Sequence, residues 1–309
     1  MTRPVATCRD DVQPPIGAVR EAVAIALAED LLPLGDLSAA LLPGSARGRA
    51  AFVARAPGVV AGTRCAEQTC IQVDPDLEVT WVVGDGGEIG PGGVIGRVEG
   101  QLRSLLTAER TALNFLCHLS GVATAARRYV EAARETSPSA RIWDTRKTTP
   151  GLRSLEKAAV RAGGAANHRG NLSEGVLIKD NHLGGLSISE AVHKALERWP
   201  GRMVEVECDR VGQVTEALDA GATLVMCDNM TPDEVRVCVQ IVRAHPRGAT
   251  GSVLVEASGG VNLENVADYA RAGVDVISVG ALTHSVVALD IGLDLESVAL
   301  PGSADPGER

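Results

Sequence analysis

The spacing of apolar and polar positions differs between three stretches of the first 135 residues. Residues 17–32 repeat apolar side chains at helical spacing, which predicts an amphipathic helix. Between 48 and 100, short apolar runs are separated by Gly and Pro, which predicts strands joined by tight turns. Residues 102–135 are helical in composition, with a predicted break at Ser120 and Gly121.

From residue 138 onward, short apolar runs and helical segments alternate at a regular pitch. The apolar runs lie at 140–143, 176–178, 203–206, 223–226, 253–255 and 274–279. The helical segments lie at 152–163, 187–198, 210–220, 232–244 and 262–272. This alternation is typical of parallel βαβ units, and a short strand predicted at 164–167 makes seven. Seven strands are enough for a barrel or an incomplete one.

Chemically reactive residues follow these apolar runs. In a βα barrel the carboxyl ends of the strands face the active site. The residues found there are charged or glycine-rich: Asp144, Thr145, Arg146, Lys147, His168, Arg169, Lys179, Asp180, Glu207, Asp228, Ser258, Gly259, Gly260 and Gly280. A single charged residue of this kind would be interpreted as a solvated loop residue. Such residues follow all seven predicted strands, which favours a common site.

Charge is distributed unevenly along the chain. The formal net charge is −9, yet residues 141–179 hold eight Arg or Lys against three acids. Arg153, Lys157 and Arg161 share one side of the predicted helix, where we expect a largely solvated scaffold. The remaining cations of this stretch are predicted to hold a small, multiply charged anion. The acidic total argues against nucleic acid as a partner.

Each group of strand-end residues can bind one kind of ligand group: a carboxylate, a phosphate or a metal ion. Arg binds carboxylates through two parallel hydrogen bonds, and Lys supplies point charges for phosphate. Glu207 and Asp228 suit Mg²⁺, which takes a few carboxylates plus substrate oxygens. The loops ASGG, at 257–260, and VGA, at 279–281, present backbone N–H groups that can grip a phosphate.

Other sites and locations are disfavoured by the sequence. The seven cysteines show no zinc-ligand spacing, so we expect reduced, mostly buried thiols. No apolar run approaches the length that spans a bilayer, and the N-terminal residues lack an apolar signal core. We therefore expect a cytoplasmic protein without a membrane partner.

Several long motifs carry a family resemblance. DTRKTTPGLRSLEKAAVRAGGAANHR and the later IKDNH resemble the signature block of the quinolinate phosphoribosyltransferases. AEDLLPLGDLS, AERTALNFLCHLSGVAT, VEVECD, MCDNM, EASGGVN and GALTHSVVALDIGLD resemble the other landmarks of that family, in the same order. The resemblance covers about residues 22–294, with small departures at Ser38 and Cys208.

The resemblance implies a reaction and a fold. Quinolinate and phosphoribosyl pyrophosphate would give nicotinate mononucleotide, CO₂ and pyrophosphate, a step of de novo NAD biosynthesis. The implied α/β fold has an N-terminal α/β sandwich at 1–114, joined by 286–300, and an incomplete seven-stranded α/β barrel of parallel strands at 115–285. Residues 301–309 are predicted to form a disordered tail.

The resemblance also implies a homodimer and a set of site residues. The quinolinate carboxylates would be surrounded by Arg146, His168, Arg169, Lys179 and Arg110 of the partner subunit. The predicted catalytic residues are Lys147 near pyrophosphate and ribose, and Glu207 and Asp228 near the ribose hydroxyls and Mg²⁺. The 5′-phosphate would be held by Ser258, Gly259, Gly260 and Gly280, with His284 close by.

Two other functions remain open. A barrel enzyme could use Lys147 or Lys179 as a Schiff-base nucleophile, but this leaves the other cations and the SGG loop without a role. A non-catalytic or differently specific homologue of the same fold is the second alternative. Every charged landmark is present in this chain, which favours the catalytic reading.

Overall fold

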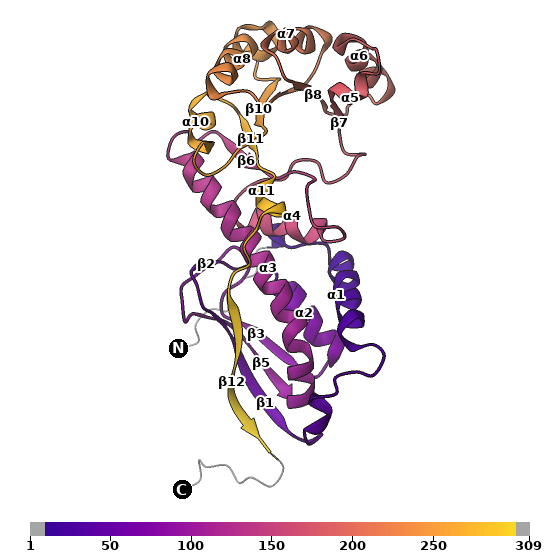
Figure 1. Cartoon of the computed structure of the whole chain (residues 1–309), viewed down its shortest axis with the longest axis vertical. Coiled ribbons are helices and arrows are strands. Elements are labelled where there is room, and N and C mark those ends of the chain that lie inside the picture. The colour runs from indigo at the N-terminus through magenta and orange to yellow at the C-terminus, as the bar shows by residue number, and fades with distance from the viewer. Residues whose placement is uncertain (1–9, 301–309) are drawn as a thin grey trace. The chain divides into compact units, whose positions relative to one another are not determined.

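The computed structural model describes residues 10–300, so the predicted tail at 301–309 lies outside the described residues (Figure 1). The chain divides into two compact units. The first comprises Met1–Ala125, Thr149–Gly164 and Val286–Arg309, and the second comprises Ala126–Thr148 and Ala165–Ser285. The domain boundaries inferred from the family resemblance stay predictions.

The first unit is built on a four-stranded antiparallel sheet with the order β12-β1-β5-β3. Its strands are β1 (Arg47–Ala54), β3 (Glu78–Trp81), β5 (Val94–Gln101) and β12 (Ile291–Ala299). A second, two-stranded sheet joins β2 (Gly58–Val59) and β4 (Glu88–Ile89). β12 comes from the end of the chain and pairs along the whole of β1, from Arg47 opposite Ala299 to Ala54 opposite Ile291.

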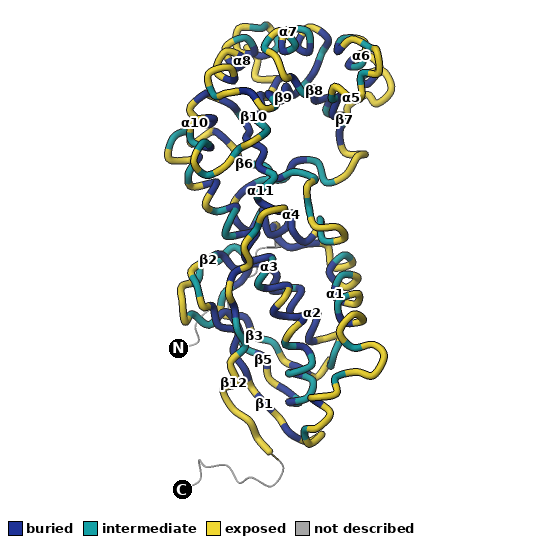
Figure 2. Tube along the Cα trace, viewed as in Figure 1, coloured by how far each residue is buried: buried dark blue, intermediate teal, exposed yellow. Residues whose placement is uncertain are grey.

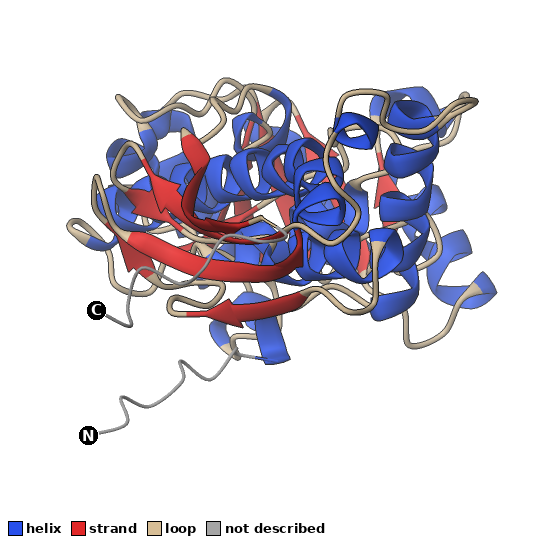
Figure 3. Ribbon diagram, turned by 90° about the horizontal axis from the view of Figure 1, so that it is seen from below, coloured by secondary structure: helices blue, strands red, loops and turns tan. Residues whose placement is uncertain are grey.

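Helices cover one face of the antiparallel sheet (Figure 3). The elements of this unit are η1 (Asp10–Val12), α1 (Ile16–Leu31), η2 (Ala39–Leu41), α2 (Thr63–Val73), the first part of α3 (Leu102–Arg134) and α4 (Arg153–Ala162). The core joins side chains of the sheet, such as Phe52 and Ile95, to Ala66 of α2 and Leu116 of α3. Burial of these apolar side chains stabilises the layer.

The predicted break at Ser120 and Gly121 is wrong, because α3 continues through both residues. Ser120 is fully buried, and its hydroxyl accepts from Ala61 N and donates to Ala61 O, at 3.0 and 3.1 Å. A side chain at Gly121 would collide with the backbone of Val287. These two residues are therefore small because another segment approaches the helix closely, not because the helix ends.

The cations of α4 form a helix face as predicted, but the expected solvated face is wrong. Lys157 is buried, and Arg153 and Arg161 are each only partly exposed. The Arg161 guanidinium donates to the backbone oxygens of Asp11 and Gln13, at 3.2 and 3.3 Å. This side of α4 therefore packs against the chain rather than facing solvent.

The second unit contains a parallel sheet of six strands with the order β6-β11-β10-β9-β8-β7. The strands are β6 (Arg141–Trp143), β7 (Val176–Ile178), β8 (Val204–Cys208), β9 (Leu224–Asp228), β10 (Leu254–Ser258) and β11 (Val276–Ser278). The segment predicted as a further strand at 164–167 contributes a single parallel bridge, from Ala166 to Trp143. The predicted α/β fold class is confirmed.

Helices connect these strands and pack on the outside of the sheet (Figure 1). They are α5 (Asp180–Leu183), α6 (Ile188–Arg198), α7 (Val211–Ala220), α8 (Pro232–Ala244), α9 (Pro246–Ala249), α10 (Val266–Arg271) and α11 (Ala281–His284). Ser187 and Thr231 begin α6 and α8 with capping boxes, in which the side chain accepts from a backbone N–H three residues later.

The strands of the parallel sheet are buried along most of their length (Figure 2). Their carboxyl-terminal residues, Asp228 of β9 and Ser258 of β10, are partly exposed. The sheet therefore opens to a surface at the strand ends. Within residues 10–300, no helix combines the length and the apolarity that crossing a membrane requires.

Candidate active site

Polar residues of the parallel strands fall on one face of the sheet because side chains alternate along a strand. On β8 the alternation places Glu205 and Glu207 on the same face, and on β10 it does so for Glu256 and Ser258. The register then sets Glu207 beside Met226 and Ser258 beside Asp228. The opposite face of β8 carries apolar residues, which pack toward the helices.

A cavity of about 510 Å³ lies over the polar strand ends. Ten of the predicted site residues line it: Arg146, Lys147, His168, Arg169, Lys179, Glu207, Asp228, Ser258, Gly259 and Gly260. The structure thus brings together residues from six separate strand ends and loops. A larger cavity, of about 760 Å³, lies beside β7 and α6, where Ile178 and Trp199 line it and none of the predicted site residues does.

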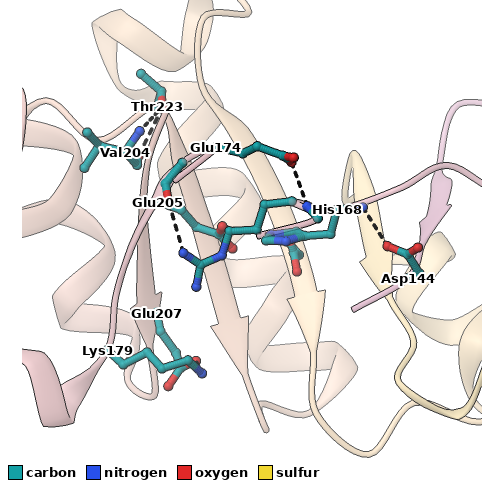
Figure 4. A network of polar contacts seen from close by, with 12 residues as sticks. Asp144, His168, Glu174, Lys179, Val204, Glu205, Glu207 and Thr223 are labelled. Atoms are coloured by element: carbon teal, nitrogen blue, oxygen red, sulfur yellow. Dashed lines mark hydrogen bonds and ion pairs between the residues drawn. The ribbon is translucent and has the colours of Figure 1, made fainter. Parts of the chain in front are cut away.

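Asp144 ties two loops of the site together (Figure 4). Its carboxylate is fully buried and accepts from His168 N at 2.9 Å and from Asn167 Nδ2 at 2.8 Å. Asp144 directly follows β6, and Arg146 and Lys147 come next along the chain. These hydrogen bonds therefore hold the β6 loop beside the His168–Arg169 segment.

The His168 side chain lies at the floor of the cavity above two buried glutamates. Its Nε2 is 2.9 Å from Glu205 Oε2 and 3.8 Å from Glu256 Oε2, and both glutamates are fully buried. The imidazole also meets the Trp143 ring edge-on, with 5.4 Å between the ring centroids. His168, Glu205 and Glu256 are the only three-residue group of possible metal ligands found among residues 10–300.

The two glutamate side chains lie side by side in the buried part of the site. Burial raises the pKa of Glu256 well above its usual range, and the charge of Glu205 raises this pKa further. The raised pKa of Glu256 favours the protonated form of its carboxyl group. Neither Glu256 oxygen has a hydrogen-bond partner that meets normal geometry within the described chain.

Two arginines lie close together at one side of the cavity. Arg169 Nη1 donates to Gly175 O at 3.0 Å. Burial lowers the pKa of Arg169, the charge of Glu205 opposes this shift, and the charge of Arg146 adds to it. Neighbouring guanidinium groups that repel each other make a favourable site for an anion with more than one carboxylate.

The predicted metal ligands lie on neighbouring strands at the edge of the cavity. Lys179 Nζ donates to Glu207 Oε2, and Asn229 Nδ2 donates to Asp228 Oδ2 at 2.8 Å. Both carboxylates are partly exposed, so each can take a further ligand. Two carboxylates with open positions fit Mg²⁺, which binds hard oxygen donors and keeps substrate or water oxygens in its shell.

Glycines shape the other end of the cavity. Gly259 and Gly260 have φ of +89° and +62°, a region that favours glycine. A Cβ on Gly259 would collide with the Asn229 amide, and a Cβ on Gly280 would lie 2.9 Å from His284 Nε2 and 3.2 Å from Lys147 Cδ. Bare backbone in these loops leaves N–H groups accessible to a phosphate.

Gly280, His284 and Lys147 therefore gather at one place, although the first two do not line the cavity. Thr283 Oγ1 donates to Lys147 O at 2.8 Å and so fixes the β6 loop against α11. Arg110 lies on α3 in the first unit, where its side chain is exposed. Its role in the site of a partner subunit stays a prediction.

Sequence reasoning missed Glu205 and Glu256. It considered the residue that follows each apolar run, whereas these glutamates lie inside the runs VEVEC and LVEAS. A sequence pattern could have identified them, because strand alternation puts each glutamate two residues before a site residue on the same face. Thr283 carried no comparable signal, since its contact joins segments 136 residues apart.

The chain matches two family models along most of its length. The model of the quinolinate phosphoribosyl transferase N-terminal domain matches residues 36–120, and that of the C-terminal domain matches residues 122–294. These two matches are contiguous except for residue 121, and together they include every predicted site residue.

Named relatives and solved structures agree with the family models. The chain is 43% identical over 282 residues to the nicotinate-nucleotide pyrophosphorylase [carboxylating] of Mycobacterium leprae, covering 90% of this chain and 97% of that one. Identity to the protein of that name from Homo sapiens is 39%, with 83% and 85% covered. The nicotinate-nucleotide pyrophosphorylase structure from Francisella tularensis has a TM-score of 0.85 at 34% identity, covering 94% of this chain and 100% of that one. The chain therefore belongs to the quinolinate phosphoribosyltransferase family.

Proposed function

We propose that this protein transfers the phosphoribosyl group of phosphoribosyl pyrophosphate to quinolinate and releases CO₂ and pyrophosphate. The product, nicotinate mononucleotide, is a precursor in de novo NAD biosynthesis. The observation that carries this proposal is that one cavity, of about 510 Å³, is lined by both the strand-end cations and the strand-end carboxylates. Membership of the family supports the same reaction.

Quinolinate binds at the cationic side of the cavity. Its two carboxylates pair with the guanidinium groups of Arg146 and Arg169. His168 and Lys179 also contact these carboxylates. The binding of a dianion relieves the repulsion between the two guanidinium groups, and Arg–carboxylate pairs form strong, directional hydrogen bonds. The clamp also holds the ring nitrogen in one orientation, which lowers the entropic cost of reaching the transition state.

Phosphoribosyl pyrophosphate binds along the glycine-lined end. The backbone of Ser258, Gly259, Gly260 and Gly280 holds the 5′-phosphate, with His284 beside it. The Lys147 side chain approaches Gly280, and its backbone oxygen accepts from Thr283 Oγ1, so Lys147 is held beside this loop. A lysine at this position supplies positive charge to the departing pyrophosphate.

Glu207 and Asp228 serve two purposes in the proposed site. They are the residues that would hold Mg²⁺, which supplies positive charge to the polyphosphate of the substrate when bound. The same carboxylates lie where positive charge develops on the ribose carbon as its bond to pyrophosphate breaks. Fixed negative groups stabilise such a cation without reorganisation of solvent.

The active unit is a homodimer in this proposal, with Arg110 of the partner subunit completing the quinolinate clamp. The exposed position of Arg110 on α3 supports a role toward another molecule. An extra guanidinium would add to the field around the two carboxylates. The cytoplasmic location expected from the sequence stays a prediction.

Product detection tests the proposed function. The purified protein is incubated with quinolinate, phosphoribosyl pyrophosphate and Mg²⁺, and products are separated by chromatography. We expect nicotinate mononucleotide and pyrophosphate in equal amounts, and neither when either substrate is omitted. A folded protein, with a cooperative thermal transition, that forms no nicotinate mononucleotide would contradict the proposal.

A further inference from the structure

Exposed apolar side chains gather in the first unit, near the end of α1 and in the loop that follows it (Figure 2). We call residues 25–41 the apolar segment. Its large apolar side chains are 64% to 87% exposed, and they are Ile25, Leu32, Leu34, Leu37 and Leu41. Single exposed leucines are common on protein surfaces, but several in one short segment indicate a contact with another protein.

The apolar segment is held against the part of α3 that carries Arg110. Thr107 Oγ1 donates to Asp36 Oδ2 at 3.0 Å. One helical turn later, Thr111 Oγ1 donates to Asp30 Oδ2 at 3.2 Å. Arg110 lies between these two threonines in the sequence and is exposed. A molecule that contacts Arg110 therefore lies close to the apolar segment as well.

The second unit also exposes apolar side chains, in the cavity of about 760 Å³ beside β7 and α6. Ile178, Leu186 and Trp199 are part of its lining, and Trp199 is 52% exposed. Within the described chain, residues 163–175 contain no helix, so the connection that leads into β7 does not cover this strand. The cavity therefore presents an apolar surface to solvent.

β7 separates this cavity from the candidate active site. Side chains alternate along a strand, so Leu177 and Lys179 line the active-site cavity. Val176 and Ile178 line the larger cavity on the other side. A residue of another subunit that approaches Lys179 is therefore one strand away from the larger cavity.

The apolar segment is long enough to reach across one strand. Arg103 Nη2 donates to Ala40 O at 3.0 Å, so the segment follows α3 from Arg103 to Thr111. These nine residues span about 12 Å along the helix axis. Layers packed on a sheet are roughly 10 Å from it. A partner subunit whose Arg110 enters the active-site cavity can thus bring its apolar segment to the far side of β7.

The charges of the two surfaces are opposite in sign. Residues 21–46 contain four acids and no Lys or Arg. The lining of the larger cavity includes His182, Lys194 and Arg198 against one acid, Glu197. Opposite charges around an apolar contact steer association and determine which surfaces meet. Two acidic segments would repel each other, which disfavours a dimer formed by the apolar segments alone.

We propose that the apolar segment of one subunit binds in the 760 Å³ cavity of a second copy of this chain, with Leu34 against Trp199. Each copy supplies one segment and one cavity, so a twofold dimer contains the contact twice. The inference rests on the proposed function, in which Arg110 acts across a dimer interface. It adds the two surfaces that hold the subunits together.

Two substitutions weaken the two sides of this contact. Leu34→Lys places a charge in the apolar segment, and Trp199→Ala removes the aromatic side chain from the cavity. Sedimentation velocity of the full-length proteins, without substrates, measures the dimer dissociation constant. We expect wild type to be a dimer. Each variant should raise the constant by about 10²-fold or more, because the contact is lost twice in each dimer.

A matched control lies on β12. Leu295 is 50% exposed and is outside both surfaces, so Leu295→Lys makes the same chemical change as Leu34→Lys at another exposed leucine. The dissociation constant of this variant should equal that of wild type.

A mixture of the two variants shows whether the segment contacts the cavity. A hybrid of Leu34→Lys with Trp199→Ala has one intact contact and one contact with both changes. Changes at residues that touch each other are not additive, so the hybrid loses less than the average of its parents. Native mass spectrometry should therefore find that hybrids exceed half of all dimers.

A monomeric wild type would overturn the proposal, and so would dimers of either variant as stable as those of wild type. Hybrids at half of all dimers, or equal weakening by Leu295→Lys, would also contradict it. If Leu34→Lys lacks a cooperative thermal transition, Leu37→Lys takes its place. These measurements need no substrate. A wild type that dimerises as expected but forms no nicotinate mononucleotide would count against the proposed function alone.

Discussion

Burial and pairing decide what single residues contribute to this site. Arg169 is partly buried next to Arg146, which raises the free energy of the empty clamp. A dicarboxylate ligand offsets that cost by supplying two negative charges. Asp144 and Glu205 have no contact with solvent, and their hydrogen bonds hold His168 from its main chain and from its ring.

Loss of Arg169 should abolish quinolinate turnover. Arg169→Ala removes a charge-assisted pair to a substrate carboxylate, so we expect kcat/KM to fall by about 10²-fold or more. The thermal unfolding midpoint should stay near that of wild type, because within the described chain the guanidinium donates one hydrogen bond, to Gly175 O. Arg202→Ala, at an exposed position outside the cavity, is the control. Near-normal kcat/KM in Arg169→Ala would reject the carboxylate clamp.

Glu256 should make stability depend on pH. The pKa of its carboxyl is raised in the folded protein above the usual 4.5, so its contribution is fully present below about pH 4.5 and is lost as pH rises through the folded value. Glu256→Gln removes this loss. The unfolding free energy of the variant relative to wild type should therefore increase between pH 5 and pH 8, measured by chemical denaturation. A difference that stays constant or decreases over this range would show that Glu256 is charged at little cost.

At the scale of elements, local patterns predicted the strands and helices of the parallel sheet. Each of its six strands follows from an apolar run, and the capping boxes at Ser187 and Thr231 are readable in the sequence. The break in α3 was predicted wrongly because Gly121 serves a contact with Val287, and such a contact between distant segments leaves no local pattern. The strand predicted at 164–167 reduces to one bridge for the same reason, since pairing depends on neighbours.

Part of the candidate site could likewise be predicted from the sequence. Residues at strand ends could be found because βα units place them at one edge of a sheet, and ten of them line one cavity. The buried glutamates beneath the site, Glu205 and Glu256, were missed. A single glutamate inside an apolar strand cannot be assigned to a site until the positions of the neighbouring strands are known. The burial of Lys157 was missed because charge alone does not reveal what packs on a helix.

The SGG turn should tolerate substitution very unevenly. Gly259→Ala forces a side chain into a positive φ and against Asn229, so we expect unfolding free energy to fall by about 1–3 kcal/mol. Gly260→Ala meets only the strain of its φ, because no described atom lies within 4 Å of its added Cβ. Urea unfolding of both variants measures the difference. Equal losses, or a greater loss in Gly260→Ala, would contradict the close approach of Asn229.

At the scale of the whole molecule, the proposed site requires two subunits. The cavity is built from the second unit, while Arg110 belongs to the first. In the proposed homodimer, Arg110 of the partner subunit would reach the cavity. β12 returns from the second unit to pair with β1, so neither unit is formed by one continuous piece of chain.

Mixed dimers should recover activity that neither parent has. Arg110→Ala and Lys179→Ala are each expected to be inactive alone. Random subunit exchange makes half of the dimers hybrid, and each hybrid holds one intact site, so roughly a quarter of wild-type activity should return. Native mass spectrometry verifies the exchange. Exchange without any gain in nicotinate mononucleotide formation would show that Arg110 does not act across an interface.

The central claim is that the strand-end cations form a clamp for a dicarboxylate, and substrate discrimination tests it most directly. The measurement compares kcat/KM for quinolinate and nicotinate, with phosphoribosyl pyrophosphate saturating and nicotinate mononucleotide as the common product. Nicotinate lacks one carboxylate and leaves part of the positive charge of the partly buried clamp without a partner, so we predict a preference for quinolinate of about 10⁴-fold or more. Comparable values for the two substrates would contradict the clamp.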